Sequence, residues 1–148
     1  MTEYVAGFLF SPDRELVALI RKNRPQWQAG RLNGIGGHIE PTDECPKFAM
    51  RREFGEETGV SVPSREWPED WQHFCTGAGD GWRVHFYRAF SGAIYNLESP
   101  TDEKVALYGV AQLPRECMTN LRWLIEMALS MDAERAAAFE VKEIGHGL

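Results

Sequence analysis

Two apolar runs of strand length open the chain, and a polar turn separates them. Residues 4–10 and 16–20 are apolar, and residues 11–14 between them carry proline at the second position, which is typical of a β-turn. We therefore predict two neighbouring strands, joined as a hairpin or adjacent in a sheet. The polar stretch that follows, residues 23–31, contains proline and glycine and indicates a loop.

The next segment predicts a short strand and then a helix. The strand is expected at residues 38–40. Either Thr42 or Asp43 is expected to cap the start of the helix. Pro46 is tolerated in the first turn, where its missing N–H costs little. Gly59 suits the left-handed backbone just past the helix end.

This predicted helix has one acidic and one apolar face. Glu53, Glu56 and Glu57 stand at i, i+3 and i+4, which places three carboxylates side by side. They repel one another unless a cation lies among them, and a hard divalent cation with oxygen ligands meets that need. The ordinary alternative is a solvated acidic surface. Met50 and Phe54 are expected to anchor the other face in the core.

The second half of the chain begins with further strands. They are predicted at residues 71–76 and 83–90, and the glycine-rich segment 77–81 between them favours a hairpin connection. Residues 105–110 are predicted as another strand. Strands, a helix, more strands and then helices favour a sheet with helices on both sides.

Two helices are predicted near the C-terminus. Thr119 is expected to cap the first, and residues 132–144 are alanine-rich and predicted as the second. The apolar positions of the first follow the spacing of an amphipathic helix: Leu121, Leu124, Ile125, Ala128 and Leu129.

Length and composition are those of an ordinary globular protein. The 148 residues suit a single domain over 1–148, and 43% of them are hydrophobic and 26% charged. No apolar run approaches membrane-spanning length, and the N-terminus lacks a basic signal-peptide region. We expect a cytoplasmic protein that binds no membrane, either a monomer or a homodimer.

The cysteines do not indicate a disulfide framework or a zinc site. Cys45, Cys75 and Cys117 are odd in number, widely separated and outside any CxxC motif, so we expect reduced thiols. The net charge of −6 argues against stable nucleic-acid binding. A local basic patch nevertheless precedes the glycine pair and suits a small anionic substrate: Arg21, Lys22, Arg24 and Arg31.

The segment from the glycine pair Gly36-Gly37 to Val60 carries the most specific motif. It contains Arg52-Glu53, Glu56-Glu57 and then Gly59, and it resembles the Nudix box, GX5EX7REUXEEXGU with U aliphatic.

The resemblance has departures. Aligned on Arg52, the box expects its first glycine at His38, so the loop over residues 40–44 is one residue longer than the pattern. Counting back from Arg52 places Glu44 at the first box glutamate, and Phe54 replaces the usual aliphatic.

The resemblance implies a fold, a reaction and roles for these residues. A Nudix domain is an α/β/α sandwich with a mixed β-sheet, an α+β fold, and the family uses Mg²⁺, with Mn²⁺ as a substitute. Glu56 and Glu57 are then metal ligands, Glu53 is a ligand or positions the water, and the Gly37 carbonyl is a further ligand. Arg52 orients the glutamates through a salt bridge.

The general base is implied less directly. Relatives recruit a glutamate from a loop distant in sequence, and Glu103, in the loop before the strand at 105–110, is the candidate. A solvated loop acid is the ordinary alternative. Glu40, Glu44 and Glu53 are other choices.

Substrate contacts are predicted from basic, aromatic and amide residues. Lys22 and Arg24 are candidates to hold phosphates. Trp27 and Trp82 are candidates to stack on a base, although single aromatics more often pack in a core.

Residues 28–38 resemble the segment before the box in MutT-type enzymes that cleave oxidised purine nucleoside triphosphates. There the counterpart of Asn33 contacts the base. Asn120 lies where that subgroup uses acids for base contacts. The ordinary reading of Asn33 is a turn residue beside Gly34.

We therefore expect a hydrolase that cuts a nucleoside triphosphate, ordinary or oxidised, to the monophosphate and pyrophosphate. The alternative substrates are ADP-ribose, another nucleotide sugar or a dinucleotide. Those subgroups often carry proline or tyrosine about sixteen to eighteen residues past the box, and residues 76–78 contain neither. An alternative from another class is a non-catalytic nucleotide sensor, which does not need the full set of metal ligands.

Overall fold

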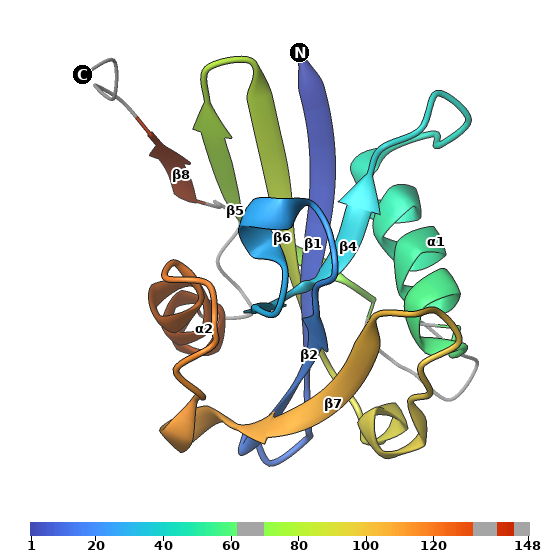
Figure 1. The fold of residues 1–148 in the computed structure, drawn as a ribbon, viewed down its shortest axis with the longest axis vertical. Helices are drawn as coiled ribbons and strands as arrows, with labels where there is room; N and C mark the ends of the chain where they lie inside the picture. The colour runs from blue at the N-terminus through green and yellow to red at the C-terminus, as the bar shows by residue number, and fades with distance from the viewer. Residues whose placement is uncertain (62–69, 132–138, 144–148) are drawn as a thin grey trace.

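The computed structural model of the protein describes residues 1–61, 70–131 and 139–143. These residues form an eight-stranded mixed sheet with a helix on each side (Figure 1). Strands follow the order β3-β2-β1-β6-β5-β8, while β4 pairs with β1 and β7 pairs with β2. The strands are β1 (Thr2–Phe10), β2 (Leu16–Arg21), β3 (Leu32–Asn33), β4 (Ile35–His38), β5 (Gln72–Gly79), β6 (Trp82–Phe90), β7 (Lys104–Gly109) and β8 (Phe139–Lys142). The α-helices are α1 (Pro46–Thr58) and α2 (Leu121–Ser130), and the short 3₁₀ helices are η1 (Gln26–Gln28), η2 (Gly92–Asn96) and η3 (Val110–Gln112).

Each side of the sheet has its own hydrophobic core, because alternate residues of a strand point to opposite faces. On β1, Phe8 joins the cluster that contains Leu121 and Leu124 of α2. Its neighbour Leu9 joins the cluster that contains Met50 and Phe54 of α1. The predicted sandwich, and the predicted core role of Met50 and Phe54, are therefore confirmed.

Several strand predictions are confirmed in place and pairing. β1 and β2 are antiparallel, and so are β5 and β6. The predicted connection over residues 77–81 is shorter than expected, because residues 77–79 pair with β6 as the end of β5 and only Asp80 and Gly81, with φ 80°, form the turn. The strand predicted at 38–40 lies earlier, as β4, because Gly36 and Gly37 pair with Ala6 and Val5 of β1. Only His38 of the predicted span is in the strand.

The predicted helix over residues 132–144 is wrong where the structure describes it. Residues 139–142 form β8, an edge strand that runs parallel to β5. Pairing with the free edge of β5 overrides the weak local preference for helix. Residues 132–138 and 144 lie outside the described ranges.

Both predicted helix caps are wrong. Cys45 occupies the cap position of α1 in extended conformation, and no side chain caps that end. The cap position of α2 is Asn120, not Thr119, again without a side-chain cap. At the other end of α1 the prediction is confirmed, since Gly59 is left-handed with φ 73° and donates its N–H to the Gly55 carbonyl.

The antiparallel pair of β2 and β7 positions two loops that matter for the site. Arg21 at the end of β2 is opposite Lys104 at the start of β7. The residues that follow Arg21 therefore lie beside those that precede Lys104, although about 80 residues separate them in sequence. In the described residues, neither α-helix is long and apolar enough to cross a bilayer.

Candidate active site

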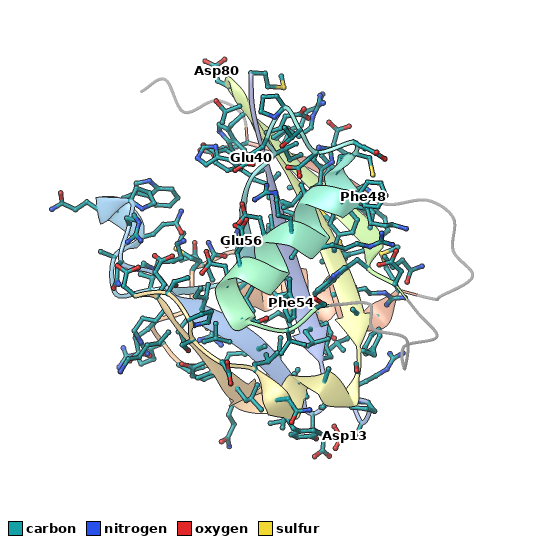
Figure 2. All side chains as sticks on the ribbon, turned by 90° about the vertical axis from the view of Figure 1, so that its right-hand side faces the viewer. Asp13, Glu40, Phe48, Phe54, Glu56 and Asp80 are labelled. Carbon is teal, nitrogen blue, oxygen red and sulfur yellow. The ribbon has the colours of Figure 1, made fainter. Side chains whose placement is uncertain are left out.

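Arg52 lies at the centre of a network of carboxylates on α1. Its Nη1 donates to Glu53 Oε1 at 3.0 Å and to Glu56 at 3.3 Å, and its Nη2 donates to the His38 carbonyl at 3.0 Å. Glu40 Oε1 lies 3.6 Å from Nη1. Figure 2 shows Glu40 and Glu56 on the same side of α1. The arginine thus connects β4, the loop before α1 and two of the three predicted metal-binding glutamates.

The principal partner of Arg52 is Asp43. Its carboxylate accepts from Nε at 3.0 Å and from Nη2 at 2.8 Å, and its side chain is only 6% exposed. These hydrogen bonds lower the pKa of Asp43 and raise the pKa of Arg52.

Counting from the motif placed Glu44 at this point, but Glu44 is exposed and Asp43 makes the contact instead. The turn in which Asp43 N–H donates to the Glu40 carbonyl, and Asp43 Oδ2 accepts from Glu40 N–H, brings that carboxylate toward Arg52. The contact also explains why Asp43 does not cap the helix. The sequence signal for this difference was the extra residue in the loop over residues 40–44, because an insertion shifts the position that is reached by counting along the motif.

Glu53 lies directly against the backbone of Gly37. A Cβ on Gly37 would fall 2.6 Å from the Glu53 carboxyl carbon, so only glycine leaves room for this carboxylate. Glu53 is 8% exposed, and burial raises the pKa of its carboxyl, with smaller contributions from the charges of Glu56 and Glu57. Arg52 opposes the shift without cancelling it.

The other two glutamates differ in their surroundings. Glu56 is exposed, and both oxygens of its carboxylate accept from Arg52 Nη1 at 3.3 Å. Glu57 is half-buried, and its Oε2 lies 3.3 Å from the Thr101 hydroxyl. Burial raises the pKa of Glu57, and the nearby negative charge of Glu103 raises it further. Crowded carboxylates with raised pKa values form a site that a cation would stabilise.

Glu103 is placed next to Glu57, as required of a residue from a distant loop. It is 4% exposed and tied to the loop after β2: Oε1 accepts from Lys22 Nζ at 2.9 Å, and Oε2 accepts from Asn23 N at 2.6 Å and Arg24 N at 3.4 Å. Burial alone would raise its pKa, but the Asn23 amide and the Lys22 ammonium outweigh burial, so the pKa is lowered. Glu103 is a buried, ionised group rather than a solvated loop acid.

The two predicted phosphate-binding residues are both ion-paired. Lys22 binds Glu103, and Arg24 binds the exposed carboxylate of Asp102 at 3.0 and 2.8 Å. The Arg24 side chain is 64% exposed, so it remains available to an anion. The Lys22 side chain is 19% exposed and its ammonium already has a buried partner.

The predicted base-contacting amides come from adjacent segments. Leu32 and Cys117 form a parallel bridge, and Met118 N donates to the Leu32 carbonyl, so Asn33 and Asn120 each lie within two residues of the point where the two segments meet. Asn33 Oδ1 accepts from its neighbour's N–H, Gly34 N, at 2.8 Å, and its Nδ2 donates to Gln28 Oε1 at 3.0 Å.

Asn120 Oδ1 is buried and has no hydrogen-bond partner among the described residues. Of the predicted stacking residues, Trp27 on η1 is exposed, whereas the Trp82 ring covers Gly79.

The donor set suits a hard divalent cation in kind. Carboxylates and a backbone carbonyl are the ligands that Mg²⁺ and Mn²⁺ prefer. In the conformation described, no group of three or more His, Cys, Asp or Glu side chains within residues 1–61, 70–131 and 139–143 is gathered closely enough to hold a metal ion. Arg52 and Thr101 hold the glutamates by hydrogen bonds instead.

Comparison with known structures shows the same architecture. A MutT structure from work on Aliivibrio salmonicida and Vibrio cholerae aligns with TM-score 0.64 and 22% identity, covering 88% of this chain and 98% of that one. A MutT NUDIX hydrolase from Burkholderia pseudomallei aligns at 0.63 and 21%, covering 86% and 98%. The NUDIX domain of Shewanella oneidensis NrtR, complexed with ADP ribose, aligns at 0.61 and 21%, covering 86% and 85%. The comparison with curated proteins found no match.

The mixed sheet between two helices is the fold of these MutT and NUDIX hydrolase structures, and in this chain α1 carries Arg-Glu-x-x-Glu-Glu beside a glycine pair. The sequence model of the NUDIX domain family matches residues 2–125. The chain therefore belongs to the Nudix family and is MutT-like in fold. Members of this family act on small nucleoside diphosphate derivatives and generally use divalent metals.

Proposed function

We propose that this Nudix hydrolase cleaves nucleoside triphosphates to the monophosphate and pyrophosphate with Mg²⁺. One observation carries the proposal. Arg52 holds Glu53 and Glu56 on one face of α1, while the third glutamate, Glu57, faces the buried carboxylate of Glu103 from another loop. Cations stabilise such a concentration of negative charge, and a bound divalent metal ion would supply positive charge to both the carboxylates and the phosphates.

The metal would be held by the carboxylates of Glu53, Glu56 and Glu57 and by the Gly37 carbonyl. Bound there, it would neutralise charge on the phosphate oxygens, and Mn²⁺ would substitute for Mg²⁺. The space beside Gly37 is what admits Glu53 to this set. Arg52 keeps the carboxylates oriented when no cation is bound, which reduces the reorganisation that catalysis requires.

Glu103 is proposed to accept a proton from the attacking water. A carboxylate has about four lone-pair positions, and three of those on Glu103 accept from Lys22, Asn23 and Arg24. The position that remains is on Oε1 and would accept the hydrogen bond of the attacking water. Glu53, whose pKa is raised rather than lowered, is the alternative base, and Glu40 and Glu44 are more exposed.

Substrate recognition is proposed to use Arg24 for phosphate, and Asn33 and Asn120 for the base. The unpartnered Asn120 Oδ1 would accept a hydrogen bond from an N–H of the base, which would remove the cost of leaving it buried without a partner. The MutT-type enzymes that this chain resembles use acids where Asn120 stands. An amide differs from an acid in base recognition, because it keeps its acceptor oxygen at every pH and also carries a donor.

ADP-ribose is the second candidate substrate. The structural neighbour NrtR was solved in complex with ADP ribose, and its NUDIX domain shares the fold of this chain. A nucleoside triphosphate and ADP-ribose both contain the diphosphate that the proposed metal site needs. They differ in the group attached to that diphosphate, which is a phosphate in one and a ribose in the other.

The test is a product-resolved activity screen with Mg²⁺ and Mn²⁺. The panel contains ordinary and oxidised purine triphosphates, ADP-ribose and dinucleotides, and the products are separated as pyrophosphate, phosphate and nucleotide. We expect monophosphate and pyrophosphate from at least one triphosphate, and loss of turnover in Glu57→Gln. Glu126→Gln, an exposed acid on α2, is the matched control and should retain activity.

Two outcomes would contradict the proposal. One is no product from any substrate while calorimetry detects tight nucleotide binding, which would indicate a non-catalytic sensor. The other is full activity in Glu57→Gln, which would remove the proposed metal site. Cleavage of ADP-ribose alone would keep the reaction class and replace the substrate.

A further inference from the structure

The loop between η2 and β7 carries two hydroxyl residues with similar backbone contacts. Ser99 Oγ accepts from Val105 N at 2.9 Å, and Thr101 Oγ1 accepts from Glu103 N at 3.1 Å. Both hydroxyls therefore help to hold the loop. Thr101 differs in one respect, since its Oγ1 also lies 3.3 Å from Glu57 Oε2 on α1.

The proton of the Thr101 hydroxyl has two possible acceptors. They are Glu57 Oε2 at 3.3 Å and the Glu103 carbonyl at 3.4 Å. A hydroxyl carries only one proton. The carboxylate is the stronger acceptor because the hydrogen bond to it is charge-assisted. The hydroxyl proton is thus directed at Glu57, while Thr101 Oγ1 accepts the Glu103 N–H and is held in place by it.

The loop that presents this hydroxyl is anchored next to the site. Glu103 is tied to Lys22 Nζ at 2.9 Å and to Asn23 N at 2.6 Å, and these contacts join the loop to the end of β2. Thr101 is two residues from this anchor and bonds to its backbone. The Thr101 hydroxyl is therefore held in a fixed place beside the Glu57 carboxylate.

We propose that Thr101 is a positioning residue that orients Glu57 toward the metal, an inference that rests on the proposed function. The motif on α1 carries no donor for Glu57, since Arg52 contacts Glu53 and Glu56. Thr101 supplies that donor from a loop more than 40 residues away in sequence. Arg52 and Thr101 together hold all three glutamates.

The test compares Thr101→Val, Thr101→Ser and Ser99→Ala. Valine has the shape of threonine without the hydroxyl, serine keeps the hydroxyl, and Ser99→Ala removes a hydroxyl that bonds the same loop without contacting Glu57. The main readout is the affinity of each protein for Mn²⁺ alone, measured by electron paramagnetic resonance of free Mn²⁺ without substrate. Thermal unfolding checks that each variant is folded.

We expect Thr101→Val to weaken Mn²⁺ binding by about threefold to tenfold, which corresponds to the loss of one hydrogen bond of ordinary strength, in keeping with its 3.3 Å length. Thr101→Ser should bind Mn²⁺ like the wild type, and so should Ser99→Ala. In turnover, Thr101→Val should need more metal for half-maximal rate, with a smaller change at saturating metal.

The outcomes separate this inference from the proposed function. If Glu57→Gln abolishes Mn²⁺ binding while Thr101→Val binds Mn²⁺ like the wild type, the role of Thr101 is wrong and the metal site stands. An equal loss in Thr101→Val and Ser99→Ala also overturns it, since that pattern reports loop stability. If Glu57→Gln leaves Mn²⁺ binding intact, the metal site itself fails.

Discussion

Arg52 and Asp43 form a two-pronged pair, with Nε 3.0 Å from Oδ1 and Nη2 2.8 Å from Oδ2. Parallel N–H···O bonds of this kind fix the plane of a guanidinium as well as its position. The third nitrogen, Nη1, is thereby directed at Glu53 and Glu56. The orientation of two proposed metal ligands thus depends on an aspartate that is not on the helix.

Asp43→Asn should lower kcat by about tenfold or more, because hydrogen bonds to charged groups contribute about 1.5–3 kcal/mol and asparagine accepts only one of the two. The KM for the nucleotide should change little, since Asp43 is not proposed to touch substrate. Steady-state kinetics measure both quantities. Glu44→Gln is the control and should stay within about twofold. If Glu44→Gln were the more damaging change, motif counting would have identified the right residue.

Asp43 should also make the stability of the protein acid-sensitive. Its pKa in the folded state is lowered from the unfolded value of about 3.9. Its stabilising effect is therefore fully present above that value and is lost as the pH falls through the folded pKa. Urea unfolding of wild type and Asp43→Asn should show a gap that is widest above about pH 5 and narrows in stronger acid. A gap independent of pH would contradict this account.

Lys22 is expected to act through Glu103 rather than through phosphate. Glu103→Gln should reduce kcat by about 100-fold or more as loss of a general base, and Lys22→Met should reduce kcat less. The double variant should be no worse than Glu103→Gln, because a residue that only holds Glu103 has nothing left to hold. A further rise in KM in the double variant would instead assign Lys22 to phosphate binding, as the sequence had suggested.

Gly37→Ala should abolish turnover while leaving the fold intact, because the new Cβ would meet the Glu53 carboxylate at 2.6 Å and displace it. Gly55→Ala is the matched control. Apart from its own helix, the nearest atom to this Cβ in the described part of the chain is the Val60 carbonyl oxygen at 3.9 Å, and alanine within a helix is worth about 0.5–1 kcal/mol more than glycine. Kinetics and thermal unfolding should show an inactive folded Gly37→Ala and an active, slightly more stable Gly55→Ala. An active Gly37→Ala would contradict this account, because it would mean that the Glu53 carboxylate can function from another position.

Local signals were sufficient for α1 and its acidic face. The spacing of Glu53, Glu56 and Glu57 and the terminal Gly59 are short-range features, and the structure contains the helix that they predict. The roles of these residues in catalysis remain predictions.

Asp43 was missed because motif positions are counted along the chain, whereas the turn between Glu40 and Asp43 decides which carboxylate reaches Arg52. The contact of Thr101 with Glu57 depends on the pairing of β2 with β7, which no local pattern reveals. β8 was missed because pairing with an edge, rather than its own sequence, makes it a strand.

The Lys22–Glu103 pair joins residues that are 81 positions apart. A partly folded chain that lacks the β2–β7 pairing is not expected to form it. Closing so large a loop costs conformational entropy, and the contacts of the paired strands compensate for that cost. The carboxylates on α1 can be present in such a chain, but the acid that faces them cannot. Recovery of nucleotide hydrolysis during refolding should therefore lag behind recovery of helix. Enzymatic activity would then report when β2 and β7 pair, the last long-range step of folding.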